Sequence, residues 1–329
     1  MSASPARAAE PSPSGVASTA AGRPLKVFIL AGQSNMEGQG MIAADPDRNG
    51  GKGSLEFLAK DPVTAPKFGH LLDAAGAWRV RDDVWIDYLG RKGPLTVGFG
   101  ARSDRMGPEL GFGEVVGDHF TEPVLLIKLA WGGKSLAVDF RPPSAGGETG
   151  PYYRTLIDDT KRILADPGAG FRELEGCRPE LVGFGWHQGW NDRVNQGFND
   201  AYETNLATFI RDVRRDLGSP KLPFVIAETG MSGHEEKHPR ALSLMRAQAA
   251  VVDYPEFQGN VAFVGTKDFF RPKEVSPSGQ AYHWNSNAET YYRIGEAMGE
   301  AMLHLLPATS DAPASGQAEP RDIGDLINQ

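Results

Sequence analysis

The chain has 329 residues, of which 40% are hydrophobic and 23% charged, a composition typical of a globular protein with a sizeable core. Its net charge of -8 disfavours nucleic acid and anionic membrane surfaces as partners, because both repel excess carboxylates. The single cysteine, Cys177, excludes an internal disulfide and a thiolate-rich metal site. No apolar run approaches the roughly 18 residues that span a bilayer. We therefore expect a small or neutral substrate, and neither a membrane nor a nucleic acid as a partner.

Composition divides the chain into three parts. Residues 1–24 are rich in Ala, Ser and Pro and lack the apolar stretch of a signal peptide, so we expect a disordered leader there. Residues 25–306 carry the periodic apolar segments of one folded domain, and residues 307–329 have the composition of a flexible tail. Whether the protein is exported, and so its localisation, stays open.

Five apolar runs alternate with helical patterns along the predicted domain. The predicted strands are residues 26–30, 124–130, 181–185, 224–228 and 261–264. The predicted helices are residues 107–119, 152–165, 198–217, 239–252 and 288–306. This alternation favours an α/β fold with a mostly parallel five-stranded sheet and helices on both faces. Between about 41 and 105 lies an inserted region, in which alternating apolar residues predict a small hairpin or meander.

Ser34 stands just past the first predicted strand, within Gly32–Met36. Residues at this position of an α/β sheet often carry the chemistry, which makes Ser34 a candidate nucleophile. A serine at the start of a helix also serves as a helix cap. Position alone leaves both interpretations open.

The chain also contains the other groups that a nucleophilic serine needs, namely a base and donors for an oxyanion. Gln188 follows the third predicted strand and offers an amide donor. Gly107 precedes a helix and offers an unhindered backbone N–H, and His283 precedes the last helix and offers an imidazole base. Together these residues favour a serine hydrolase.

Five motifs occur in a fixed order along the chain. They are Gly32-Gln33-Ser34-Asn35-Met36, Gly107-Pro108-Glu109-Leu110, Trp131-Gly132-Gly133-Lys134-Ser135-Leu136, Trp186-His187-Gln188-Gly189 and Arg246-Ala247-Gln248. In this order they resemble the sialate O-acetylesterase and acetylxylan esterase branch of the SGNH hydrolases, over roughly residues 24–306. The resemblance implies a flavodoxin-like three-layer α/β/α sandwich. It also implies a metal-independent serine esterase, without a cofactor, that removes O-acetyl groups from carbohydrates through an acetyl-enzyme.

The resemblance further implies roles for single residues. Ser34 is the expected nucleophile and His283 the expected base. The N–H groups of Ser34 and Gly107 and the amide of Gln188 are the expected oxyanion hole. Two other functions stay open: a noncatalytic carbohydrate-binding protein on the same fold, and a general short-chain carboxylesterase.

Two positions depart from the family pattern and leave the orienting acid undecided. Gln280 stands three residues before His283, where the family commonly carries Asp, and Trp190 stands where similar sequences often show Glu. An acid that orients the imidazole is worth orders of magnitude in rate. Asp192 is the nearest remaining candidate for this acid. A backbone carbonyl or another acid, such as Asp268, is the alternative.

Several residues beside the motifs are candidates for substrate contact. They are Gln33, Asn35, Trp131, Lys134, Trp190 and Trp284. Tryptophan rings offer apolar faces to the C–H groups of a sugar, although core packing explains any one of them equally well. A sialic acid carboxylate would favour a contact with Arg102, Arg105 or Lys134, whereas xylan would favour an open aromatic cleft.

Three further histidines have simpler interpretations. His187 could be a base, but its place within the motif favours a packing or hydrogen-bonding role. The spacing of His234 and His238 is that of two zinc ligands on one helical face. Gly233 and Pro239 flank them and no third ligand is evident, so we expect a solvated loop rather than a metal site.

Overall fold

The computed structural model describes residues 22–307. The predicted leader, residues 1–24, and the predicted tail, residues 307–329, lie outside the described residues except for their innermost positions. The domain predicted for residues 25–306 lies within them.

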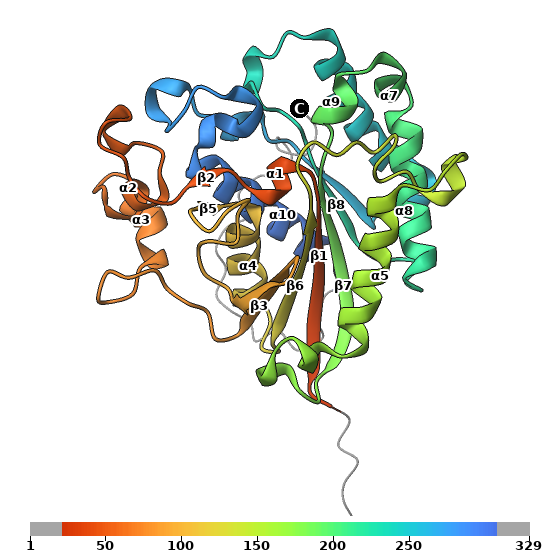
Figure 1. Cartoon of the computed structure of the whole chain (residues 1–329), viewed down its shortest axis with the longest axis horizontal. Helices are drawn as coiled ribbons and strands as arrows, with labels where there is room; N and C mark the ends of the chain where they lie inside the picture. Colours follow the sequence, from red (N-terminus) through yellow and green to blue (C-terminus); the bar gives the residue numbers. More distant parts are fainter. Residues whose placement is uncertain (1–21, 308–329) are drawn as a thin grey trace, which may run out of the picture.

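A seven-stranded sheet forms the centre of the molecule, in the order β4-β3-β6-β1-β7-β8-β9 (Figure 1). The strands are β1 (Pro24–Gly32), β3 (Val84–Tyr88), β4 (Arg91–Pro94), β6 (Val124–Ala130), β7 (Arg178–His187), β8 (Phe224–Ala227) and β9 (Val261–Val264). Neighbouring strands are parallel except β3 and β4, which form an antiparallel hairpin. The mostly parallel sheet is confirmed, but it has seven strands rather than the predicted five.

The two additional strands come from the inserted region. β3 pairs in parallel with β6, so the predicted hairpin belongs to the main sheet. β4 consists of the charged residues Arg91 and Lys92 followed by Gly93 and Pro94, a composition that edge strands tolerate and central strands do not. The inserted region also holds α2 (Leu55–Lys60), α3 (Ala65–Phe68) and a two-stranded sheet of β2 (Gly40–Met41) and β5 (Arg105–Met106).

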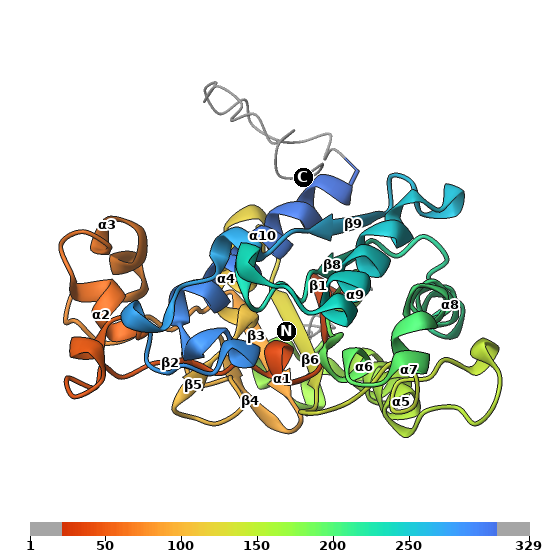
Figure 2. The same ribbon diagram turned by 90° about the horizontal axis from the view of Figure 1, so that it is seen from above.

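Helices cover both faces of the sheet (Figures 1 and 2). On one face lie α4 (Pro108–His119) and α10 (Ala288–Leu305), and on the other lie α5 (Pro151–Ala165), α8 (Tyr202–Asp216) and α9 (Pro239–Ala250). The shorter helices are α1 (Ser34–Glu37), α6 (Trp190–Arg193) and α7 (Gln196–Asp200). The predicted helix 198–217 is divided, because α7 ends before α8 begins. The three-layer α/β/α sandwich is confirmed.

The core consists of two apolar layers, one on each side of the sheet. β1 contributes to both, because successive side chains of a strand point to opposite faces. Phe28 and Leu30 pack toward α4 and α10, whereas Val27 and Ile29 pack toward α5 and α8. A central strand that is buried on both faces is apolar along its whole length, which is why this element was predictable.

The carboxyl ends of the three central strands meet at one edge of the sheet. Gly32 of β1 lies opposite Ala130 of β6 and opposite His187 of β7. Three segments therefore leave the sheet side by side, namely α1, the turn that begins at Trp131, and the segment from Gln188 into α6 (Figure 2). This edge brings three of the five sequence motifs together.

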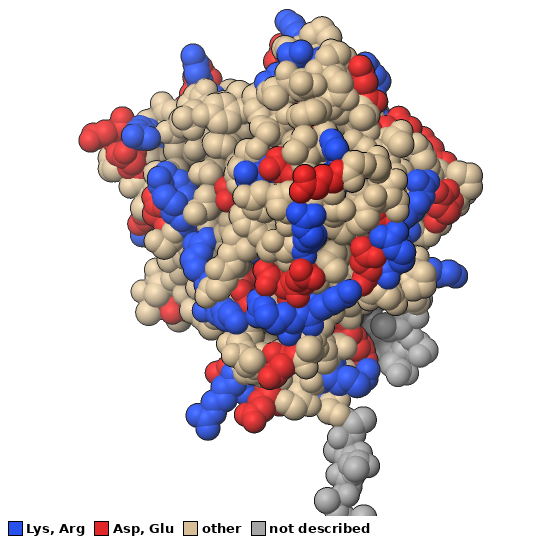
Figure 3. Space-filling view, turned by 45° about the vertical axis from the view of Figure 1, so that its right-hand side comes forward, with Lys and Arg blue, Asp and Glu red and all other residues tan. Residues whose placement is uncertain are grey.

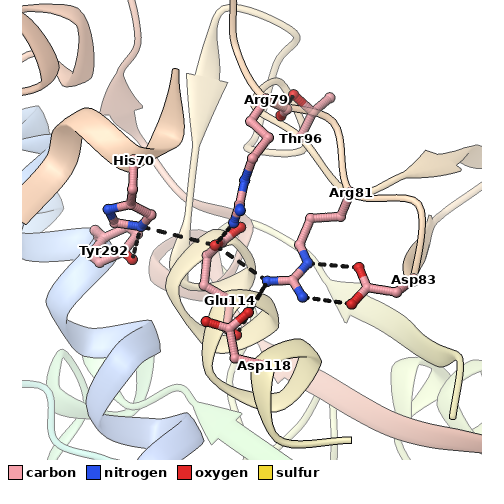
Figure 4. A network of polar contacts seen from close by, with 8 residues as sticks. All are labelled: His70, Arg79, Arg81, Asp83, Thr96, Glu114, Asp118 and Tyr292. Carbon is pink, nitrogen blue, oxygen red and sulfur yellow. Dashed lines mark hydrogen bonds and ion pairs between the residues drawn. The ribbon is translucent and has the colours of Figure 1, made fainter. Parts of the chain in front are cut away.

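A network of charged residues lies near the opposite edge, where β3 begins (Figure 4). We call it the Arg81 network, and its members are His70, Arg79, Arg81, Asp83, Glu114 and Asp118. Arg81 is only 8% exposed and reaches Asp83 at 2.6 Å and Asp118 at 2.6 Å. The network joins the inserted region to α4 and, through a hydrogen bond between His70 and Tyr292, to α10.

The outer surface is mixed in charge on the face that Figure 3 presents, where acidic and basic side chains are interspersed. Within residues 22–307, no helix is long and apolar enough to cross a membrane.

Candidate active site

Ser34 is the first residue of α1, directly past the carboxyl end of β1. A Cβ at Gly32 would lie 2.2 Å from the carbonyl oxygen of His187, so only glycine lets β1 approach β7 here. Ser34 is partly exposed, while its neighbours Gln33 and Asn35 are buried. The Ser34 N–H donates no hydrogen bond within the described residues.

His283 lies in the segment Ala281–Ser286, just before α10. Its imidazole is partly buried, and this burial lowers its pKa from the usual 6.5. Two neighbours hold the segment against α1. The Asn35 side chain donates to the carbonyl of Tyr282 at 3.4 Å, and the Tyr291 hydroxyl lies 3.0 Å from Asn35 Oδ1 and 3.3 Å from the His283 carbonyl. The structure thus brings the Ser34 and His283 segments together.

The imidazole of His283 has no acidic partner in the described part of the chain, where no carboxylate oxygen lies within 4.0 Å of it. Gln280, at the position of the family's Asp, is exposed. Its backbone carbonyl accepts the backbone N–H of His283, not the imidazole. Asp268, the alternative considered from the sequence, pairs with His234 at 2.7 Å.

Asp192 occupies a different place from the one expected for an acid that orients His283. Its two oxygens accept the backbone N–H groups of Leu136 and Ala137, both at 2.8 Å, and one also accepts the Gln188 amide at 2.6 Å. The carboxyl is fully buried, and burial raises its pKa to about 6. Asp192 therefore holds the loop that follows β6, and both of its oxygens are engaged there.

Gln188 and Gly107, the expected oxyanion donors, are not free to donate in the structure. Their N–H groups already form hydrogen bonds within the protein. Gln188 Nε2 donates to the carbonyl of Lys134 at 3.0 Å as well as to Asp192, which engages both amide hydrogens. The Gly107 N–H donates to Glu109 Oε1 at 2.8 Å. Glu109 is in turn paired with the buried Lys128 at 2.6 Å.

The turn Gly132–Gly133 offers a further backbone N–H at the carboxyl edge, to which the sequence analysis assigned no role. It directly follows β6, the neighbour of β1, and both glycines are exposed. Gly133 has a φ of 68°, which favours glycine, and its N–H has no acceptor among the described residues. The Glu37 carboxylate lies beside Gly132, where a Cβ would be 3.1 Å from Glu37 Oε2, and burial raises the pKa of Glu37. The available signal was its position directly after a buried strand.

The expected substrate contacts divide by exposure. Gln33, Asn35 and Trp284 are at most 2% exposed. The side-chain oxygen Oε1 of Gln33 accepts the backbone N–H groups of Gly189 and Asn191, and Trp284 packs in the core. These three side chains therefore differ from the expectation, because protein encloses them.

The other three expected contacts, Trp131, Lys134 and Trp190, are partly exposed. The ring of Trp190 lies 5.9 Å from that of Tyr282, a residue that was not predicted. Tyr282 is 40% exposed, and its ring lies 4.4 Å from the His283 ring. An open aromatic surface therefore adjoins the histidine.

An open cavity of about 480 Å³ also lies beside the segment that leads to His283. It is lined by Asp47, Arg48, Asn49, Lys273, Glu274, Pro277, Ser278 and Gly279. Its charged side chains are two acids and two bases, so the lining has no excess of either sign.

Of the other predicted histidines, His187 has no hydrogen-bond partner for either ring nitrogen among the described residues, whereas His234 and His238 each have one. His187 is fully buried, which lowers its pKa to about 4 and keeps it neutral. His234 pairs with Asp268, and His238 caps α9 by accepting the Arg240 N–H at 3.2 Å. No group of three or more His, Cys, Asp or Glu residues within 22–307 is arranged to hold a metal ion.

The parallel sheet, its two helical layers and the polar segments at its carboxyl edge define an SGNH-type α/β/α protein. Residues 24–304 match the family model described as carbohydrate esterase, sialic acid-specific acetylesterase, and the chain belongs to this family. It is therefore a carboxylic ester hydrolase of the carbohydrate acetylesterase type.

A probable carbohydrate esterase of Arabidopsis thaliana is 25% identical over 241 residues, which cover 70% of this chain and 79% of that relative. A solved structure of an Arabidopsis thaliana protein superposes with a TM-score of 0.56 at 18% identity, covering 84% of this chain and 97% of that one. NanS superposes with a TM-score of 0.53 at 16% identity, covering 86% and 98% of the two chains. A carbohydrate acetylesterase from Xanthomonas citri superposes with a TM-score of 0.51 at 14% identity, covering 85% of this chain and 56% of that one. These structures share the fold.

Proposed function

We propose that the protein is a serine esterase that hydrolyses O-acetyl esters of carbohydrates through an acetyl-enzyme at Ser34. The observation that carries this proposal is the partly exposed Ser34 at the start of α1, with the His283 segment bound to the adjacent Asn35. A serine and a base on adjoining segments are the groups that acyl transfer by a serine requires.

In the first half of the reaction, His283 takes the proton of the Ser34 hydroxyl while the Ser34 oxygen attacks the acetyl carbonyl carbon. The lowered pKa of His283 keeps the imidazole neutral at neutral pH, as a general base must be. The tetrahedral intermediate then collapses, the bond to the sugar oxygen breaks, and His283 returns the proton to that oxygen. The deacetylated sugar leaves, and the acetyl group stays on Ser34.

The oxyanion of this intermediate needs donors that are free in the resting protein. The N–H of Ser34 and the N–H of Gly133 satisfy this condition among the described residues, and they lie on segments that leave neighbouring strands. We assign these two groups in place of Gly107 and Gln188. The bonds of Gln188 and Asp192 to residues 134–137 then serve to fix the loop that carries Gly133.

In the second half, His283 takes a proton from water as the water oxygen attacks the acetyl carbon. The second tetrahedral intermediate releases Ser34, which regains its proton from His283, and acetate departs. The same two donors stabilise both intermediates, since the oxyanion forms at the same carbonyl oxygen.

The surface beside His283 supports a carbohydrate as the alcohol part of the ester. Trp190 and Tyr282 place two neighbouring aromatic rings beside His283, and such rings stack on the C–H faces of sugars. Trp131 and Lys134 lie on the adjacent loop and are partly exposed. We therefore place the sugar against these four residues.

The test is acetate release from p-nitrophenyl acetate, 9-O-acetyl sialic acid and acetylated xylan, measured for the wild type, Ser34→Ala and His283→Ala. We expect release by the wild type and a loss of at least about 10³-fold in both variants. Release from p-nitrophenyl acetate alone would indicate a general short-chain carboxylesterase. Sugar binding without any acetate release would indicate a noncatalytic carbohydrate-binding protein.

A further inference from the structure

The segment around His283 contains an unusual stretch of backbone. Trp284, Asn285 and Ser286 are consecutive non-glycine residues in the left-handed region, with φ values of 52°, 54° and 55°. This conformation costs roughly 1–2 kcal/mol per residue, so it persists only where surrounding contacts enforce it. The chain therefore reverses sharply just after His283, and the contacts that hold this reversal also hold the histidine.

The first set of contacts lies behind the reversal. Trp284 is fully buried in the core, and the Asn285 side chain donates to the carbonyl of Arg271 at 2.9 Å. The backbone N–H groups of His283 and Asn285 both donate to the carbonyl of Gln280, at 2.8 and 3.1 Å. These bonds fix the chain before and after His283, but they involve none of the residues next to Ser34.

The second set of contacts connects His283 to the nucleophile. Tyr291, in the first turns of α10, is fully buried, and burial raises its pKa well above the usual 10. Its hydroxyl therefore stays protonated, and its single hydrogen is shared by two acceptors, Asn35 Oδ1 at 3.0 Å and the backbone carbonyl of His283 at 3.3 Å. Asn35 follows Ser34 directly, and its amide donates to the carbonyl of Tyr282 at 3.4 Å and to Met231 Sδ at 3.0 Å.

We propose that Asn35 and Tyr291 are positioning residues that set the His283 segment relative to Ser34, in a site where the imidazole has no carboxylate partner among the described residues. This inference rests on the proposed function, because it assigns a role within the same site. The pair, which we call the Asn35–Tyr291 bracket, acts on the main chain of residues 282 and 283 rather than on the imidazole nitrogens. Both residues are at most 2% exposed, so neither touches the substrate.

The bracket has features suited to this role. It consists of neutral groups, which avoids the cost of burying a charge. Its hydrogen bonds run between α1, the His283 segment and α10, the three elements whose relative position sets the distance from base to nucleophile. A displacement of about 1 Å at a reacting group costs on the order of 10²-fold in rate, so small losses of restraint become visible in kcat.

The experiment compares Tyr291→Phe with Tyr292→Phe. Tyr292 is the neighbouring buried tyrosine of α10, and its hydroxyl contacts His70 at 3.2 Å in the Arg81 network instead of the site. For Tyr291→Phe we expect kcat for p-nitrophenyl acetate to fall about tenfold to hundredfold, with KM within about twofold of the wild type. For Tyr292→Phe we expect kcat within about twofold. An equal kcat in the two variants would overturn the inference.

Asn35→Ala and the double variant Asn35→Ala/Tyr291→Phe complete a mutant cycle. If the two side chains act as one unit, the loss of kcat in the double variant is close to the larger single loss. Losses that multiply would show two independent effects and would contradict the bracket. Circular dichroism melting of each variant, with kcat measured well below the melting temperature, separates this result from unfolding.

A readout that does not need catalysis keeps the bracket testable if the proposed function fails. Ser34→Ala tests the proposed function separately. If this variant released acetate as fast as the wild type, the serine mechanism would be rejected, but the bracket would not. The second readout is the rate at which diethyl pyrocarbonate modifies His283, followed by peptide mass spectrometry. We expect Tyr291→Phe to react faster than both the wild type and Tyr292→Phe. Equal rates in all three proteins would overturn the bracket.

Discussion

The two edges of the sheet use different polar chemistry. At the carboxyl edge, Asn35 and Tyr291 join the segments of Ser34 and His283 through neutral hydrogen bonds. Near the amino end of β3, the Arg81 network joins the inserted region to α4 through full charges (Figure 4). No carboxylate of residues 22–307 reaches the imidazole at the first edge, whereas three carboxylates surround Arg81 at the second.

This difference separates stability from positioning. A buried ion pair is strongly destabilising when one partner is removed, because the other charge stays buried and unpaired. A neutral hydrogen bond contributes about 1 kcal/mol to stability, yet it can fix a reacting group in place. We therefore expect substitutions in the Arg81 network to change the free energy of unfolding, and substitutions at the carboxyl edge to change catalysis.

The largest expected effect is that of Arg81→Met, which leaves the buried Glu114 with one fewer cation and removes the partner of Asp83 and Asp118. We expect the free energy of unfolding in urea to fall by about 3 kcal/mol, with kcat of the folded protein unchanged. Arg79→Met is the matched control, since Arg79 is 40% exposed and Glu114 keeps Arg81. It should lose about 1 kcal/mol or less. A large fall in kcat for Arg81→Met at full folding would remove the contrast between the edges.

The second effect is that of Asp192→Ala, which leaves the N–H groups of Leu136 and Ala137 buried without an acceptor. We expect a loss of about 2–3 kcal/mol in unfolding free energy. Asp139, which accepts the Ser135 N–H from a more exposed position, provides the control Asp139→Ala, with a smaller loss because water replaces the carboxylate. If Asp192 instead oriented His283, its removal would shift the pH dependence of kcat and spare stability.

The third effect concerns the pH dependence of kcat/KM. The base must be neutral, and burial lowers the pKa of His283, so the wild type should keep more than half of its plateau value at pH 6.5. Gln280→Asp introduces a carboxylate at the position of the family's acid. A nearby negative charge favours the imidazolium, so the acid limb should move to higher pH by about one unit. An acid limb that stays in place would show that a carboxylate at 280 does not reach the imidazole, and Gln280→Asn is the uncharged control.

The smallest effect is that of Trp190→Ala on sugar recognition. Loss of one aromatic contact is worth about 1 kcal/mol, which corresponds to a rise of roughly fivefold in KM for the preferred acetylated sugar. KM for p-nitrophenyl acetate, which has no sugar, should stay the same. A parallel rise for both esters would show that Trp190 supports the site rather than the sugar.

Most of the fold was predictable because its physical signals are local. β6 was predicted at residues 124–130 and is found there, since a strand buried on both faces is continuously apolar. β4 was missed because an edge strand of Arg, Lys, Gly and Pro has the composition of a turn. The separation of α7 from α8 was missed because the apolar stripe continues across Ala201.

The site was predictable in its motifs and less so in its contacts. A glycine before a helix indicates a free backbone N–H. In the structure, however, the Glu109 carboxylate accepts the N–H of Gly107. The spacing of Asp192 shows that it lies near the site, but not that its oxygens bind residues 136 and 137. Tyr291 stands at a core position of its helix in the sequence pattern. Its proposed role depends on which groups its hydroxyl binds, and only the tertiary structure determines these.

The most direct test of the account is to identify the residue that carries the acetyl group during turnover. The protein is mixed with p-nitrophenyl acetate, quenched in acid within the first turnover, digested and mapped by mass spectrometry. We predict one acetyl group on Ser34 in the wild type, and no acetylated peptide above background in Ser34→Ala. Acetate release by the wild type without an acetyl group on Ser34, together with undiminished release by Ser34→Ala, would contradict the account.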